Sequence, residues 1–76
     1  MAWELDRGVA NVFTSADPSN AWALIEGHDW LKINPSSPDG VTNVFILLNT
    51  AMVQDRRVDV FITANGMIHA AAASPV

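Results

Sequence analysis

The chain has 76 residues, half of them hydrophobic, with no cysteine and a formal net charge of −4 at pH 7. This length predicts a single domain, residues 1–76, and excludes a doubly wound sheet, a β/α barrel and a two-domain enzyme. Without a disulfide or an evident metal site, the remaining way to stabilise so small a domain is association with copies of itself.

The acidic balance argues against nucleic acid as a partner. The sequence has four basic and eight acidic residues, whereas a protein binds a phosphate backbone through clustered lysine and arginine residues. The adjacent pair Arg56 and Arg57 is better explained as cations at a helix C-terminus. No apolar run approaches the about 18 residues of a membrane span, and we expect no signal peptide in Met1 to Glu4. Localisation stays open between the cytoplasm and secretion after processing.

Two polar tracts rich in Pro, Ser, Asp and Asn, residues 14–20 and 34–40, divide the chain into three pieces. The first piece, Val9 to Thr14, is rich in β-forming residues and predicts a strand. The second piece alternates apolar residues from Ala21 to Ile33 and is interrupted at residues 26–29. This pattern predicts two strands around a short turn.

The third piece begins with a helical pattern from Val41 to Asp55. At 100° per residue its apolar side chains fall on an arc of roughly 160°, which predicts one broad face against a core. That face consists of Val41, Val44, Phe45, Leu47, Leu48, Ala51 and Met52.

The opposite face of this predicted helix carries no formal charge before Asp55. Its spacing of four, three and four residues is that of a coiled-coil seam, so we expect it to contact neighbouring copies. A moderately polar, solvent-exposed face is the alternative. The residues of this predicted oligomer interface are Thr42, Ile46, Asn49 and Val53.

The C-terminal part predicts a β-hairpin, with strands from Arg57 to Ala64 and from Met67 to Ser74. Asn65-Gly66 between them favours a two-residue type I′ turn. The resulting order β-β-β-α-β-β predicts an α+β fold, either a small five-stranded barrel of the OB type or a curved antiparallel sheet close to it, with one helix between strands 3 and 4.

A two-residue turn also sets the register of this hairpin. Ile62 pairs with His69, and Phe61 and Ile68 lie together on the opposite face. Both faces are substantially apolar, although one face of an antiparallel hairpin in a monomer should be polar and exposed to solvent. We therefore add Phe61 and Ile68 to the predicted oligomer interface.

This layout resembles the cell-binding B subunits of AB5 toxins. The likeness lies in Trp30-Leu31-Lys32-Ile33, in Val44 to Val53 after a polar linker, and in Arg57-Val58-Asp59-Val60-Phe61-Ile62. It implies an OB fold assembled as a homo-oligomeric ring, a pentamer by analogy, whose helices line a central pore. It also implies a glycan ligand. The chain lacks the disulfides common in such subunits, and no sugar-binding residue matches position by position.

The chain has three tryptophans, which is a large number for its length. We expect Trp22 in the core and both Trp3 and Trp30 at least partly exposed. An exposed indole beside a polar group such as Asp29 can stack on the apolar face of a sugar ring. The alternative is that these indoles stabilise the barrel or a subunit interface by packing there. The predicted ligand-binding residues are Trp3, Trp30 and Asp29.

No catalytic motif stands out: there is no phosphate-binding loop, dinucleotide fingerprint or nucleophile elbow. His28 or His69 acting with Asp29 would be an acid–base pair, but a polar turn and a packed histidine explain these residues as well. Two histidines without cysteine predict neither a metal site nor a cofactor. We expect a non-catalytic oligomeric binding module with a glycan as ligand. The alternative is a protein–protein interaction or structural accessory protein without a small ligand.

Overall fold

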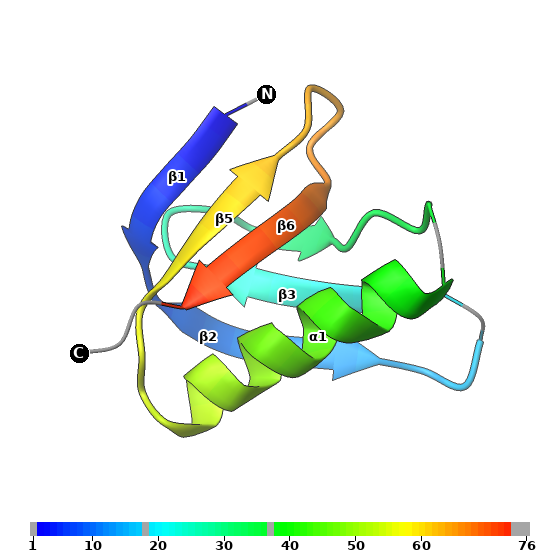
Figure 1. Cartoon of the computed structure of the whole chain (residues 1–76), viewed down its shortest axis with the longest axis horizontal. Helices are drawn as coiled ribbons and strands as arrows, with labels where there is room; N and C mark the ends of the chain where they lie inside the picture. The colour runs from blue at the N-terminus through cyan, green and yellow to red at the C-terminus, as the bar shows by residue number, and fades with distance from the viewer. Residues whose placement is uncertain (1, 18, 37, 74–76) are drawn as a thin grey trace.

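The chain forms two three-stranded antiparallel sheets and one helix (Figure 1). The computed structural model describes residues 2–17, 19–36 and 38–73. In chain order the elements are β1 (Ala2–Arg7), β2 (Val9–Thr14), β3 (Ala21–Ile25), β4 (Trp30–Lys32), α1 (Pro38–Val53), β5 (Val58–Ile62) and β6 (Ile68–Ala73). Pro18 and Ser37 of the predicted turn tracts and Ser74 of the last predicted strand lie outside the described residues.

The two sheets have the strand orders β1-β5-β6 and β2-β3-β4. Helix α1 contacts β2, β3 and β6, and lies in front of β2 and β3 in Figure 1. Gly8 separates β1 from β2, so consecutive strands belong to different sheets. The two sheets are also linked by an isolated parallel bridge, which joins Ile33, just beyond β4, to Ile68 at the start of β6. The core therefore lies between the two sheets and under the helix.

The predicted order β-β-β-α-β-β and the five-stranded barrel are wrong. The described residues form six strands in two sheets, the order is β-β-β-β-α-β-β, and the barrel is not closed. The strand that the sequence analysis lacked is β1, whose charged residues Glu4, Asp6 and Arg7 obscure its alternation. It pairs with β5, far along the chain. An edge strand needs a partner on one side only, and local patterns do not reveal such a partner.

The broad apolar helix face is confirmed. Val41, Leu48 and Ala51 are buried, while other members of that face pack against the core half-exposed. The helix begins at Pro38, and a proline suits the first position of a helix because its φ is fixed near the helical value. The buried hydrophobic residues are Ala21, Ala23, Ile25, Ile33, Val41, Leu48, Ala51, Val58, Val60 and Ile68.

The predicted hairpin forms, but its turn has a different geometry. The Gly66 N–H donates to the Thr63 carbonyl over 2.9 Å, and the Thr63 N–H donates to the Met67 carbonyl over 2.8 Å. Gly66 has a φ of 79°, whereas Asn65 does not have a positive φ. A type I′ turn needs both, so the loop is instead a type I turn followed by a left-handed glycine. The Thr63 hydroxyl, bonded to the Asn65 side chain and the Met67 N–H, supports this turn.

The longer turn shifts the register of the hairpin by one residue, and a β-bulge shifts it back. Ile62 pairs with Ile68, while Phe61 pairs with Ala70, so His69 is the extra residue of the bulge. The predicted pairing of Ile62 with His69 is therefore wrong. As a result Ile68 points into the core, where it is fully buried, and His69 is exposed.

Candidate functional site

Three aromatic rings form a cleft of about 270 Å³ on the outer face of the β2-β3-β4 sheet. Phe13, Trp22 and Trp30 line it, and we call it the aromatic cleft. Each ring comes from a different strand: Phe13 on β2 pairs directly with Trp22 on β3, and Trp30 on β4 pairs with Leu24. Phe13 is 51% exposed and Trp30 38% exposed, so both rings offer apolar area to a ligand.

Strand β3 places Trp22 on this outer face and not in the core. Ala21, Ala23 and Ile25 are the buried residues of β3, so the alternating Trp22 and Leu24 point to the other side. The expectation that Trp22 belongs to the core is wrong. Small alanine side chains on the inner face allow α1 to pack on this sheet, which leaves the larger side chains outside.

A chain of hydrogen bonds fixes the Trp22 indole. Its Nε1–H donates to Asn20 Oδ1 over 2.9 Å. The Asn20 Nδ2 donates to the Ser15 hydroxyl over 2.8 Å, and that hydroxyl donates to Asp17 Oδ2 over 3.1 Å. These residues belong to the turn between β2 and β3. The ring is therefore positioned before any ligand arrives, which lowers the entropic cost of binding.

Polar groups border the aromatic cleft on the β4 side. The Asp29 Oδ1 accepts the Trp30 N–H over 2.8 Å where β4 begins. Lys32 pairs directly with Trp22 across the strands, and its Nζ lies 5.7 Å from the centroid of the Trp22 ring. At this distance the ammonium group is attracted by the negative face of the indole. The cleft thus has apolar walls, with an ammonium group over the Trp22 ring and a carboxylate bonded to the backbone of Trp30.

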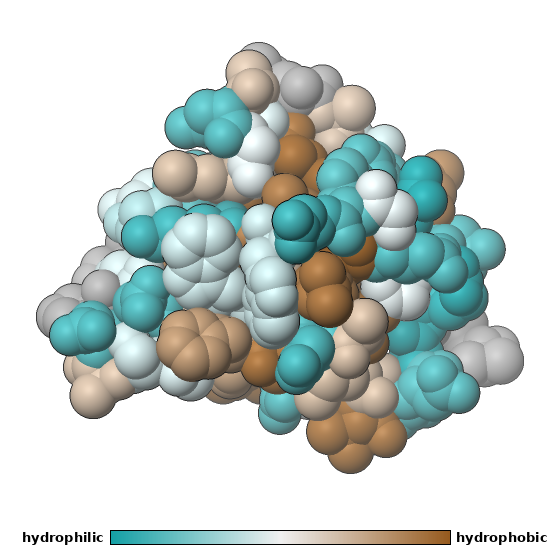
Figure 2. All heavy atoms as spheres, turned by 180° about the vertical axis from the view of Figure 1, so that it is seen from behind, coloured by the Kyte–Doolittle hydropathy of each residue, from teal (hydrophilic) through white to brown (hydrophobic). Residues whose placement is uncertain are grey.

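Figure 2 shows the molecule from behind, the side opposite the helix in Figure 1. Pale and brown side chains lie across the middle of this face, with teal hydrophilic ones between them and toward both sides. A monomeric protein seldom exposes a contiguous apolar patch without a use for it, and a patch rimmed by polar groups marks a binding surface. The aromatic cleft is the strongest candidate site that the described residues form.

The structure brings together two of the three predicted ligand-binding residues. Trp30 and Asp29 are adjacent at the cleft, but Trp3 lies on β1 in the other sheet. Trp3 is 49% exposed and makes an edge-to-face contact with Phe61, with ring centroids 5.5 Å apart. The sequence analysis missed two residues of the site, Trp22, which it assigned to the core, and Phe13. Phe13 lies at the end of its predicted strand, and only the pairing of β2 with β3 places it beside Trp22.

The predicted oligomer interface is partly exposed. Thr42, Ile46 and Val53 lie on the exposed surface of α1, and Asn49 is half-buried. Phe61 is half-buried in contact with Trp3. Ile68 has to be removed from this set, because the bulge at His69 turns its side chain into the protein's own core. It is not accessible to another copy.

His28 and Asp29 do not form an acid–base pair, and the polar turn that was the other explanation of these residues is what the structure shows. The His28 Nε2 lies 2.7 Å from Glu4 Oε1, and Arg7 Nε lies 3.5 Å from the same carboxylate oxygen. Asp29 instead bonds to the backbone of β4. Glu4, Arg7 and His28 form a half-buried cluster that connects β1 to the turn between β3 and β4. All three side chains therefore serve to hold the fold together.

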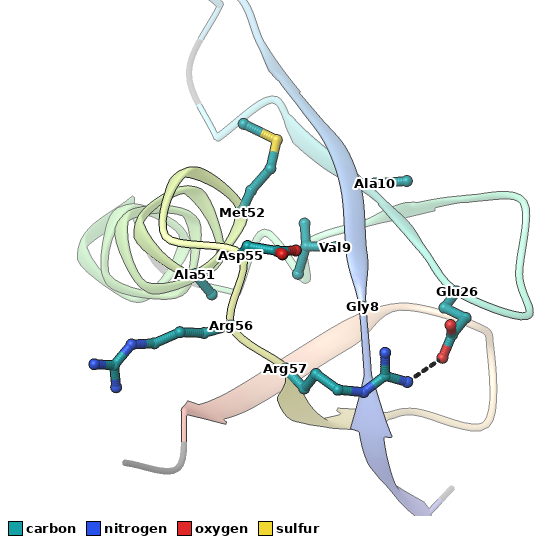
Figure 3. A pocket seen from close by; sticks show the side chains of 9 residues that line it. All are labelled: Gly8, Val9, Ala10, Glu26, Ala51, Met52, Asp55, Arg56 and Arg57. Atoms are coloured by element: carbon teal, nitrogen blue, oxygen red, sulfur yellow. Dashed lines mark hydrogen bonds and ion pairs between the residues drawn. The ribbon is translucent and has the colours of Figure 1, made fainter. Parts of the chain in front are cut away.

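A second cavity, of about 280 Å³, lies at the C-terminal end of α1 (Figure 3). Arg57 at its wall donates from Nη2 to Glu26 Oε1 over 2.5 Å and from Nε to Asp6 Oδ1 over 2.8 Å. These bonds, first to Glu26 and then to Asp6, raise the pKa of the Arg57 guanidinium above its ordinary value. Since the Arg57 guanidinium is already paired within the protein, only Arg56 of the two arginines at this cavity is left for a charged ligand.

No family model, curated protein or solved structure matches the chain. The resemblance to toxin B subunits therefore stays a prediction. Among the described residues, no helix has the length and apolar character needed to cross a membrane. Within the same residues, no group of histidine, aspartate and glutamate side chains is arranged to hold a metal ion.

Proposed function

We propose that this protein is a non-catalytic binding module whose ligand is a carbohydrate held in the aromatic cleft. The observation that carries the proposal is the convergence of Phe13, Trp22 and Trp30 from three strands on one exposed sheet face. Flat aromatic faces carry partial negative charge, and the C–H groups on one side of a sugar ring are complementary to them. A small cleft of this size suits one or two rings of a longer glycan.

The way in which the Trp22 ring is held favours a ligand-binding role of the aromatic cleft over a purely structural one. The hydrogen bond from the Trp22 indole to Asn20 holds one of the three walls without covering it. A protein partner is the alternative occupant, because aromatic residues are enriched in interfaces between proteins. We favour a glycan because the rings are exposed on an open sheet face and the Lys32 ammonium group, which can bind hydroxyls, lies 5.7 Å from the centroid of the Trp22 ring.

The first test replaces Trp30 with alanine and screens the protein on a glycan array, followed by calorimetry with each glycan that binds. We expect Trp30→Ala to weaken the binding at least tenfold, which corresponds to about 1.4 kcal/mol, because it removes an exposed indole wall of the cleft. Trp3→Ala is the matched control, as it removes another exposed indole from the other sheet. Circular dichroism checks the folding of both variants.

Two results would refute the glycan proposal. One is a wild-type protein that binds no glycan on the array. The other is equal weakening by Trp3→Ala and Trp30→Ala, because such a result would show that the binding does not involve the cleft. Co-purification of a specific protein that Trp30→Ala releases would support the alternative occupant instead.

We also propose that the module works as a homo-oligomer, in which the outer face of α1 meets neighbouring copies. Ile46 and Val53 expose more than half of their surface on this face. The helix carries no charged side chain between Asp39 and its last residue. A surface without charge is compatible with its own copy, because no like charges meet across the contact.

Light scattering after size exclusion tests this assembly. We expect four or more subunits for the wild type and a smaller mass for Ile46→Lys, since a desolvated lysine in the contact is unfavourable. Gln54→Lys, an exposed change just beyond the helix, is the control that should keep the wild-type mass. A monomeric wild type would refute the oligomer and leave the glycan proposal intact.

A further inference from the structure

We propose that the aromatic cleft selects an acidic sugar and that Lys32 binds its carboxylate. This inference rests on the proposed function, because it names the chemical class of the glycan. It makes Lys32 a specificity-determining residue next to the rings that supply the stacking contact. The class comprises uronic acids and other sugars that carry a carboxylate on the ring.

The first observation is the place of Lys32. It pairs with Trp22 and follows Trp30 by two residues on β4, so its side chain lies on the same sheet face as both indoles. The Nζ is 5.7 Å from the Trp22 ring centroid, on the border of the cleft. A ligand that stacks on the rings is therefore within reach of the ammonium group.

The second observation is the distribution of charge. The protein has a net charge of −4, and Lys32 is its one lysine. Arg57 and Arg7 both lie against carboxylates of the protein. In the described part of the chain, Lys32 makes no such ion pair, and its contact is the π-face of Trp22.

The remaining basic residue, Arg56, lies elsewhere. Its side chain projects from the C-terminal end of α1, away from the other residues drawn in Figure 3. Asp29, which precedes Trp30 in the chain, already accepts a backbone hydrogen bond from Trp30. Lys32 is thus the cation at the cleft that retains its capacity to pair with an anion.

A carboxylated sugar satisfies both features of the site at once. Its ring stacks on Trp30 and Phe13, and its carboxylate accepts a charge-assisted hydrogen bond from Lys32, which is about twice as strong as a neutral one. A neutral hexose obtains the stacking contact and a weaker hydrogen bond at most. Discrimination between the two therefore depends on one ammonium group, and it weakens as salt screens the charge.

The experiment compares methyl glycosides of glucuronic and galacturonic acid with those of glucose and galactose, which differ from them in the C6 carboxylate. Titrations are followed through the indole N–H signals of Trp22 and Trp30 in NMR spectra, at low and high salt. We expect at least tenfold tighter binding of one acidic sugar than of its neutral counterpart. We also expect Lys32→Gln to remove this preference, because it weakens the binding of the acidic sugar much more than that of the neutral one.

Lys32→Arg is the control, because it keeps the charge and should keep most of the preference. Equal binding of acidic and neutral sugars, or a preference that survives in Lys32→Gln, would overturn the inference and leave carbohydrate binding standing. No shift of either indole signal with any of the four sugars would overturn both the inference and the proposed function. Spectra of the free variants show whether the fold is kept.

Discussion

Replacing Leu48 with alanine is expected to lower the free energy of unfolding by about 3 kcal/mol or more. Leu48 is fully buried on the face of α1 that packs against the sheets. Truncation of a buried leucine loses the transfer free energy of the removed atoms and leaves a cavity, at a cost of about 2–5 kcal/mol. A domain of this length has about 4–11 kcal/mol in total, so a large part of its stability depends on this one side chain.

Urea or thermal unfolding followed by circular dichroism measures this effect. At about 4–8 °C per kcal/mol for a domain of this size, Leu48→Ala should lower the Tm by more than about 10 °C. Leu5→Ala is the matched control, because it removes the same atoms from a leucine that is 65% exposed on β1. We expect the control to change the stability by less than about 1 kcal/mol. Similar losses in the two variants would contradict the position of α1 on the core.

Replacing Ile68 with alanine is the second change for which we expect a large effect, a loss of about 2–5 kcal/mol. Ile68 is completely buried, and its carbonyl accepts the Asn34 N–H over 2.8 Å beside the bridge to Ile33. The side chain therefore fills the place where the two sheets meet. Chemical denaturation of Ile68→Ala and of the wild type at the same protein concentration measures the difference.

This second variant also tests the register of the hairpin. In the register of a two-residue turn, His69 faces the core and Ile68 lies outside, whereas the observed bulge reverses the two. His69→Ala is accordingly the control, with an expected loss below about 1 kcal/mol, since this exposed side chain has an edge contact with Phe61 and a long contact of 3.4 Å with Asn34. A larger loss for His69→Ala than for Ile68→Ala would favour the shorter turn.

The candidate site was predictable in part. Trp30 and Asp29 could be selected because tryptophan is rare and because a polar neighbour suits sugar binding. Trp22 was assigned to the wrong side of β3, since an alternating strand shows which residues share a face but not which face is inside. Phe13 could not be selected, because its place beside Trp22 depends on the pairing of β2 with β3. Trp3 was selected for its type alone, and it lies in the other sheet.

Local chemistry decided several elements of the fold. The period of apolar residues in α1, the alternation in β3 and β5, and the turn-forming residues between them have their causes within a few neighbouring residues, so the sequence alone was sufficient to predict them. It also established the acidic balance and the absence of cysteine. These features need no knowledge of which distant segments meet.

The tertiary structure decided the rest. The strand β1 exists because β5 offers it a partner, and its charged residues would not indicate a strand on their own. The inward position of Ile68 follows from a turn and a bulge that compensate each other in register. The aromatic cleft forms because three strands align their rings on one side. Each of these outcomes depends on pairings between segments separated along the chain, and such pairings are selected by the packing of the whole molecule.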